Sequence, residues 1–352
     1  MKKFFAAANT EKGFVNLFEE VFAPEKFRHV YILKGGPGTG KSTFMGNVGL
    51  IAQSKGYDVE YICCSSDPRS LDGVIIADLS VAILDGTSPH TTDPIYPGAI
   101  ERIVDLGEAF DLHALEKKRE ELVALIRAKK ESYRAAYRLL SAVGRIEKEH
   151  DDLLRNFYLE EKADAAVRRI AASFRRKGKD EERKRYISAI CAEGFCRLNT
   201  LSEQAKKVYA VTDKNGLGYL FMETLYRRLR AEGYSLTVCD SPVTEARKEA
   251  VFLNEEEVLF IVVKEDAEEA DAADKIINSM RFADKGEMSK RRRRLRFMEK
   301  CEAAVLEGAV SCFADASVAH AKAERIYGTC VDFSGIDVII GKIINEIFTN
   351  NV

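Results

Sequence analysis

Residues 28–43, with the sequence RHVYILKGGPGTGKST, constrain the fold of this chain more than any other stretch. The run Val30–Leu33 is apolar and β-branched and is followed by glycines, which predicts a short buried strand. After the glycines, Phe44, Val48 and Ile51 recur at spacings of four and three residues, which is the period of one helix face. The stretch therefore predicts a strand, a glycine-rich loop and a helix in direct succession.

The loop satisfies the Walker A pattern G-x-x-x-x-G-K-[ST]. Glycines let consecutive backbone N–H groups turn toward a phosphate, and the helix N-terminus adds the positive end of its dipole. Lys41 can reach the β- and γ-phosphates, and the Ser42 hydroxyl can ligate Mg²⁺. An accidental match is the alternative, but it would not require the strand before the loop and the helix after it. We therefore expect the chain to bind Mg²⁺ and ATP, or another nucleoside triphosphate, through Gly35, Gly36, Pro37, Gly38, Thr39, Gly40, Lys41, Ser42 and Thr43.

With this motif the chain resembles the P-loop NTPases. More narrowly, it is similar to a poorly characterised bacterial family of proteins, inferred to be ATPases, that carry two P-loop-like halves in tandem. The similarity rests on residues 4–107, where the chain reads FFAAANTEKGF, GGPGTGKST, SSDPRSLDGV and AILDGTSPH, and it extends more weakly over the rest. The resemblance implies an α/β fold in which a mostly parallel sheet carries the P-loop.

The bulk properties limit the classes of partner. The 352 residues suffice for two domains, each with its own core. Charged residues make up 31% of the chain and the net charge is −2, which favours neither nucleic acid nor membrane as a partner. There is no apolar run of about eighteen residues, and the apolar part of MKKFFAAANTEKGF is short for a signal peptide. We therefore expect a cytoplasmic protein with no membrane partner.

The positions of the prolines distinguish a region of strands and loops from a helical region. Six of the seven prolines lie between Pro24 and Pro97, so the first hundred residues are predicted to form strands and loops. Residues 112–176 lack proline and carry a mostly helical apolar period, which predicts a helical hairpin that projects from the sheet. Gly144 and Gly178 are the candidate helix breaks.

An internal repeat divides the chain into halves. Four segments of the first half align, in order, with four of the second: 5–14 with 186–195, 30–33 with 208–211, 56–59 with 233–236, and 81–85 with 258–262. One such match could arise by chance, but four in order favour a duplication. The predicted domains are a P-loop domain over 1–180, with its helical insertion at about 112–176, and a second P-loop-like domain over 181–352.

The second copy is predicted to have lost its chemistry. Against GGPGTGKS it offers DKNGLGYL, in which Tyr219 and Leu220 align with Lys41 and Ser42. Tyrosine and leucine supply neither the charge nor the metal ligand, and Asp213 would repel a polyphosphate. This departs from the family pattern, in which the second half often keeps a P-loop, so a single nucleotide site is expected.

A second motif follows the first at the usual distance. Val81–Asp85 is an apolar run that ends in a carboxylate, as in a Walker B strand, and Asp85 is the expected partner of Ser42 at Mg²⁺. The next residue is Gly86, so the catalytic glutamate that follows this aspartate in many ATPases is absent. The catalytic base must come from elsewhere in the chain.

Two loops could supply the catalytic base. Cys64–Arg69 and Gly86–His90 each follow a predicted strand, and the carboxyl ends of such strands form the ligand crevice of doubly wound sheets. Asp67 could position water or accept a proton, and His90 could do the same or contact phosphate. The alternative is turn chemistry without a catalytic role, because Asp-Pro and Ser-Pro favour loops.

The most basic run is a candidate for nucleic-acid binding, although not the favoured one. Residues 255–274 are strongly acidic and would balance it, and aromatic residues do not alternate with it. A solvated helix face is the commoner explanation for Lys290, Arg291, Arg292, Arg293, Arg294 and Arg296.

The chain is thus predicted to be an α/β P-loop protein that binds and hydrolyses Mg²⁺–ATP. One alternative is a small-molecule or nucleotide kinase, because GGPGTGK also resembles the phosphate loop of adenylate kinases and a helical insertion can act as a lid. Another is a nucleotide-dependent switch or scaffold with little turnover. The sequence names neither the acceptor nor a protein partner.

Overall fold

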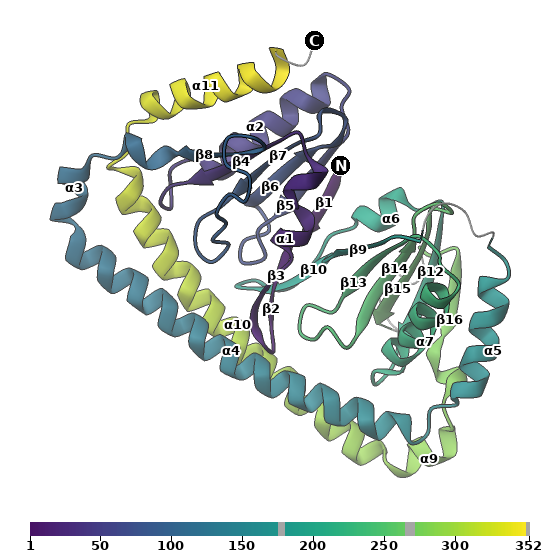
Figure 1. Ribbon diagram of the computed structural model, residues 1–352. Helices are drawn as coiled ribbons and strands as arrows, with labels where there is room; N and C mark the ends of the chain where they lie inside the picture. Colours follow the sequence, from purple (N-terminus) through teal and green to yellow (C-terminus); the bar gives the residue numbers. More distant parts are fainter. Residues whose placement is uncertain (175–179, 265–271, 350–352) are drawn as a thin grey trace.

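The computed structural model describes residues 1–174, 180–264 and 272–349 (Figure 1). The chain forms two α/β halves, each built on a six-stranded sheet. The first sheet has the order β1-β5-β6-β7-β4-β8, from β1 (Lys2–Phe5), β4 (His29–Lys34), β5 (Val59–Cys63), β6 (Leu71–Ile76), β7 (Val81–Asp85) and β8 (Glu101–Asp105). The second has the order β9-β13-β14-β15-β12-β16, from β9 (Glu182–Arg185), β12 (Lys207–Asp213), β13 (Leu236–Asp240), β14 (Lys248–Leu253), β15 (Val258–Lys264) and β16 (Lys275–Asn278).

The two sheets have the same strand order and the same strand directions. In each, the third strand of the order, β6 or β14, is antiparallel to both neighbours, and the other neighbouring pairs are parallel. Both are therefore mixed, mostly parallel sheets. The central strands are buried nearly throughout, which explains why their sequences are continuous apolar runs rather than alternating ones.

Each half also contributes a hairpin near the centre of the molecule. The hairpins are β2 (Ala7–Thr10) with β3 (Gly13–Asn16), and β10 (Ser188–Cys191) with β11 (Gly194–Arg197). Just before them, Phe5 and Tyr186 exchange backbone hydrogen bonds, at 2.8 Å from Phe5 N and 3.0 Å from Tyr186 N. An approximate two-fold axis thus passes between these residues.

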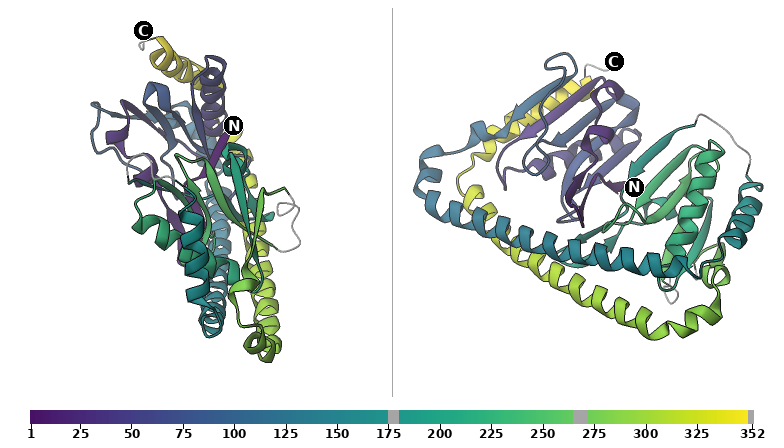
Figure 2. Two further views of the ribbon diagram at one scale, coloured as in Figure 1. Left: turned by 90° about the vertical axis from the view of Figure 1, so that its right-hand side faces the viewer. Right: turned by 60° about the horizontal axis from the view of Figure 1, so that its bottom comes forward.

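Two long helices run along one side of both halves (Figure 2). They are α4 (Arg119–Arg155) and α10 (Arg292–Gly328), each 37 residues long. They pack antiparallel, because Glu149 of α4 pairs with Arg294 near the start of α10 and Lys129 contacts His320 near its end. The apolar seam between them includes Leu140 and Phe313.

The final helix of each half packs on the other half. Helix α5 (Glu160–Ala171) joins α7 (Leu217–Ala231) against the second sheet, and α11 (Phe333–Thr349) joins α2 (Lys41–Ser54) against the first. The crossings are held by matching hydrogen bonds, each 2.8 Å long, from Asp111 N to Cys330 O and from Asp284 N to Phe157 O. Neither half is complete without the other. The other helices within the described ranges are α1 (Phe18–Val21), α3 (Leu112–Lys117), α6 (Thr200–Gln204), α9 (Lys285–Lys290) and the 3-10 helices Pro24–Lys26, Ala77–Leu79, Leu106–Ala109 and Ser279–Phe282.

The prediction that residues 112–176 form a helical hairpin is wrong, because the long helix of this segment pairs with a helix of the second half. Most of residues 112–171 is helical, as expected, but α4 continues through Gly144 and pairs with α10 rather than folding back on itself. Gly144 marks a close contact instead of a break, since a Cβ there would lie 2.0 Å from Glu11 Oε2. Residues 175 and 176 and the second candidate break, Gly178, lie outside the described residues.

Among the described helices, none has both the length and the apolar character needed to cross a bilayer.

Candidate functional site

The glycine-rich loop lies between β4 and α2, as the motif predicts. Gly38 and Gly40 have φ values of 75° and 81°, in the left-handed region that glycine enters without strain. Gly40 caps α2 without a side-chain hydrogen bond. Within the described part of the chain, the backbone N–H groups of residues 40–43 form no hydrogen bond with a backbone carbonyl. These donors and the positive end of the helix dipole can therefore act together on an anion.

Lys41 folds back over this loop. Its Nζ donates to Gly35 O at 3.0 Å and to Gly36 O at 2.9 Å, and it lies 3.7 Å from Asp85 Oδ2. Asp85 is held in turn by Thr87, whose backbone N and Oγ1 donate to Asp85 Oδ1 at 2.8 and 2.6 Å. The structure thus brings together the lysine and the aspartate that the two motifs predict.

The same place offers ligands suited to Mg²⁺. Asp85 ends β7, directly beside β4, and is paired in register with Leu33. Ser42 Oγ accepts a hydrogen bond from Leu71 N at 2.9 Å, which fixes the hydroxyl near the start of α2. The described residues contain no group of three or more His, Cys, Asp or Glu side chains that could hold a metal alone. A hydroxyl and a carboxylate fit Mg²⁺, which usually takes its other ligands from phosphate and water.

His90 is buried beside a carboxylate that the sequence analysis missed. Its ring stacks on Phe18 with centroids 4.5 Å apart, and the ring of Phe14 meets it edge-on. Its Nε2 lies 3.1 Å from Asp72 Oδ2. Burial acts to lower the pKa of His90, but the negative charges of Asp72 and Asp85 outweigh it and raise the pKa. The aromatic packing fixes the ring, and Asp72 favours a proton on Nε2.

Asp67 lies on the loop after β5 and forms a turn contact. Its Oδ1 accepts hydrogen bonds from Arg69 Nε at 2.9 Å and from Arg69 N at 3.2 Å. The carboxylate is partly exposed and does not contact Lys41 or Asp85. This geometry favours the turn alternative for Asp67 over a catalytic role.

One of the long helices, α10, also reaches the glycine-rich loop, which the sequence analysis did not anticipate. A Cβ on Gly38 would lie 2.9 Å from Glu324 O of α10, and a Cβ on Gly36 would lie 3.3 Å from the ring of Tyr327, also on α10. Helix α10 therefore packs directly against the loop. No local sequence signal marks this contact, because Glu324 is in the other half of the chain.

In the second half, β12 and α7 also flank a tight loop, but it is two residues shorter than the predicted alignment requires. Gly216 caps α7 with a φ of 87°, in the place of Gly40. Leu217 and Gly218, rather than Tyr219 and Leu220, therefore stand where Lys41 and Ser42 stand in the first half. The error arose because aligning the last glycines of the two loops ignored their difference in length. The replacements still provide neither a charge nor a metal ligand.

A carboxylate of the chain itself fills the second loop. Asp213 Oδ1 accepts from Gly218 N at 2.7 Å, and Oδ2 accepts from Gly216 N at 3.1 Å. Burial raises the pKa of Asp213, while these N–H donors oppose the rise. Two of the N–H groups that an anion would use are thus already satisfied internally.

A buried ionic cluster closes the second loop. The guanidinium of Arg247 donates to Glu147 at 2.7 Å and to Asp151 at 2.8 Å, both on α4, and lies 5.0 Å from the centre of the Tyr219 ring. Desolvation raises the pKa of Glu147 to about 8, although Arg247 opposes the rise. Arg247 thus ties the second half to the long helix that begins in the first.

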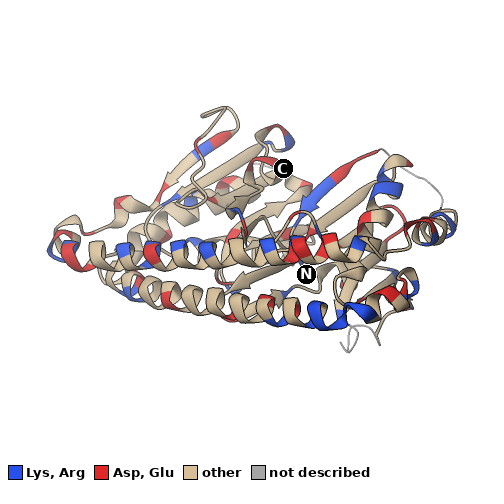
Figure 3. Cartoon of the chain, turned by 90° about the horizontal axis from the view of Figure 1, so that it is seen from below, with Lys and Arg blue, Asp and Glu red and all other residues tan. Residues whose placement is uncertain are grey.

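The basic run lies at the junction of α9 and α10, on the surface (Figure 3). Lys290 and Arg291 form ion pairs with Glu287, and Arg294 forms one with Glu149. The balancing carboxylates therefore come from α9 itself and from α4. Part of the acidic segment 255–274 lies outside the described residues. These pairs favour a solvated helix face.

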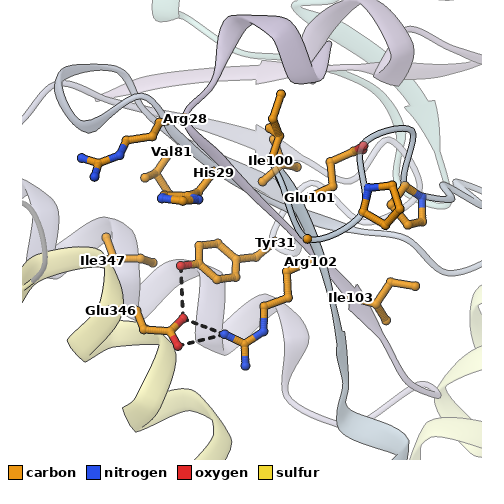
Figure 4. Close-up of a pocket in the computed structure, with 14 residues that line it drawn as sticks. Arg28, His29, Tyr31, Val81, Ile100, Glu101, Arg102, Ile103, Glu346 and Ile347 are labelled. Atoms are coloured by element: carbon orange, nitrogen blue, oxygen red, sulfur yellow. Dashed lines mark hydrogen bonds and ion pairs between the residues drawn. The ribbon is translucent and has the colours of Figure 1, made fainter.

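A pocket of about 510 Å³ is remote from the loop (Figure 4). It lies at the opposite end of β4, beside α11, where Arg102 donates to Glu346 Oε1 at 2.8 Å and the Tyr31 hydroxyl lies 3.4 Å from Oε2. Burial and the charge of Glu346 raise the pKa of Tyr31 to about 12. Because His29 lines the pocket and Lys34 precedes the loop, the length of β4 separates the two.

Comparison with protein-family models, curated proteins and solved structures found no match to this chain.

Proposed function

We propose that this chain is a P-loop ATPase of the cytoplasm, in which the first half binds Mg²⁺–ATP and the second half is a degenerate copy without a nucleotide. The observation that carries the proposal is the difference between the two loops. In the first, Lys41 and Asp85 lie beside a loop in which the N–H groups of residues 40–43 bond to no backbone carbonyl of the described residues. In the second, Asp213 takes those donors.

Different residues at the first loop bind different parts of Mg²⁺–ATP. The N–H groups of residues 39–43 bind phosphate oxygens, and Lys41 moves from its own loop carbonyls to the β- and γ-phosphates. Ser42 and Asp85 hold Mg²⁺, which when bound neutralises charge that develops on the phosphates. For a proton acceptor, we favour His90 over Asp67, because Asp72 lies at its Nε2 whereas Arg69 binds the Asp67 carboxylate.

A nucleotide-dependent switch with little turnover is the second candidate. The backbone of Glu324 in α10 packs against Gly38, so a ligand in the loop would act on a helix that runs to the other half. Gly86, in place of a catalytic glutamate, also agrees with slow hydrolysis.

Phosphate release and label transfer separate these functions. Purified protein with Mg²⁺–ATP should release phosphate without an added acceptor if it is an ATPase. Transfer of labelled phosphate to a member of a metabolite panel would instead identify a kinase, and tight binding without either product would identify a switch.

Replacing Asp85 with asparagine should raise the Mg²⁺ concentration for half-maximal phosphate release by about tenfold, because asparagine keeps the shape but loses the charge. Phosphate release should be measured against Mg²⁺ concentration. Asp93→Asn is the matched control, since Asp93 is an exposed carboxylate on the loop that follows β7. Identical Mg²⁺ curves for Asp85→Asn and the unaltered protein would remove Asp85 from the metal site.

A further inference from the structure

Two basic side chains lie where α10 packs on the glycine-rich loop. His320 precedes Glu324 by one helical turn of α10, and the Glu324 carbonyl O would lie 2.9 Å from a Cβ on Gly38. Lys129 of α4 and His320 of α10 are both half-buried, and Lys129 Nζ is 3.1 Å from His320 Nδ1. Among the described residues, Lys129 forms no ion pair, and its other contact is with the ring of Tyr133. A half-buried lysine without a carboxylate partner is unusual, because burial disfavours its charge.

Both groups are affected by the charge of Lys41. Burial lowers the pKa of Lys129, and Lys41 lowers it further, although Cys64 and Glu324 oppose the shift. Burial, Lys129 and Lys41 lower the pKa of His320 to about 4, against an opposing effect of Asp67. Two lysines and a neutral histidine, from three helices, therefore converge on one region. An anion there would relieve the repulsion between the lysines and would favour protonation of the histidine.

The second half provides an internal comparison. Asp111 and Asp284 are equivalent residues at the starts of α3 and α9. The difference between their residue numbers also separates the first residues of α4 and α10, and the last residues of these two helices. The same offset places Glu302 at the position of Lys129 and Glu147 at the position of His320. Both glutamates lie near Arg247, whose charge acts on their pKa values. The helices therefore present bases to the loop that has Lys41, and acids to the loop that lacks it.

We propose that Lys129 and His320 together bind the γ-phosphate of a nucleoside triphosphate held by residues 35–43. This inference rests on the proposed function. A triphosphate, unlike a diphosphate, then contacts α4 and α10 as well as α2 and so joins both long helices to the first sheet. The site distinguishes triphosphate from diphosphate through residues outside the Walker A motif.

Proton uptake should accompany binding of the triphosphate. His320 is neutral at pH 7 in the free protein, where the charges of Lys129 on α4 and Lys41 on α2 act on it more strongly than Asp67 on the loop after β5. Its own helix contributes Glu324, which is exposed. A phosphate dianion beside the ring would favour the protonated form.

Calorimetric titration of the full chain with Mg²⁺–ATP and with Mg²⁺–ADP tests the inference. Lys129→Ala and His320→Ala should each lower ATP affinity by about tenfold or more and leave ADP affinity unchanged, as expected for loss of a charged phosphate contact. Lys129→Arg should retain most of the preference for ATP. Glu302→Ala, at the equivalent position in the second half, should alter neither affinity. Titrations in buffers of different ionisation enthalpy should show that His320→Ala abolishes the proton uptake.

Equal losses of ATP and ADP affinity in the alanine variants would overturn the inference and assign the pair a structural role. Unchanged ATP affinity would overturn it as well, while leaving the proposed function intact. Failure of the unaltered protein to bind either nucleotide would overturn both proposals. If Lys129→Ala does not fold, Lys129→Gln gives the same comparison with less loss of packing.

Discussion

Replacing Lys41 with alanine is expected to weaken Mg²⁺–ATP binding by about tenfold or more. The variant loses a charged hydrogen bond to phosphate, which contributes about 1.5–3 kcal/mol. It also leaves Asp85 without the ammonium that now lies 3.7 Å away, so one positive charge fewer offsets the repulsion between Asp85 and the phosphates. Titration with a fluorescent ATP analogue measures the change directly.

Lys55→Ala is the matched control for this prediction. Lys55 follows the other end of the same helix and contacts the ring of Phe348, remote from the loop. The control should bind ATP as the unaltered protein does. If Lys41→Ala also bound ATP with unchanged affinity, the loop would not be a Walker A site.

The second large effect is on stability. Arg247→Leu should lower the free energy of unfolding by about 3–5 kcal/mol, the usual result when one member of a buried ion cluster is removed. Leucine would leave the buried Glu147 and the half-buried Asp151 without their guanidinium. The effect should be large because Arg247 is 5% exposed and links the second half to α4. Chemical denaturation followed by circular dichroism provides the measurement.

An exposed ion pair of the same helices serves as the comparison. Arg294 and Glu149 also join α10 to α4, but the two side chains are 56% and 60% exposed. Arg294→Leu should therefore change the free energy of unfolding by about 1 kcal/mol or less. Similar denaturation midpoints for Arg247→Leu and Arg294→Leu would show that the buried cluster does not stabilise the protein.

Local sequence patterns were sufficient for the parts of the fold that local interactions determine. The run Val30–Leu33, the glycines after it and the helical period from Phe44 correctly predicted a strand, loop and helix. The carboxylate at the end of Val81–Asp85 was expected beside this strand, and the register confirms it. Such patterns work because backbone conformation and burial depend on nearby residues.

The choice of partners among the long elements could not be predicted in this way. The apolar stripe of α4 indicates a buried face, but the same stripe fits a hairpin partner or a distant helix equally well. Helix α10 supplies the partner through Phe313 and its neighbours, far along the chain. The exchange of α5 and α11 between halves has the same origin, since an amphipathic helix does not specify which sheet it covers.

The candidate site likewise contains residues that local motifs predict and residues that only the packing of distant helices brings together. Lys41, Ser42 and Asp85 belong to motifs whose spacing reflects their chemistry. Lys129 and His320 belong to no motif, because their relation to the loop depends on how two helices cross it. The shorter second loop was also missed, since a glycine can be aligned with either of two neighbouring glycines until its φ angle is known.

The number of ATP molecules bound per chain tests the central claim most directly. The two halves share a strand order but differ in their loops, because Asp213 satisfies the donors of the second loop. Isothermal titration with Mg²⁺–ATP should therefore give one site per chain, and Lys41→Ala should weaken that site. Two sites per chain, or one site that Lys41→Ala leaves unchanged, would contradict the account.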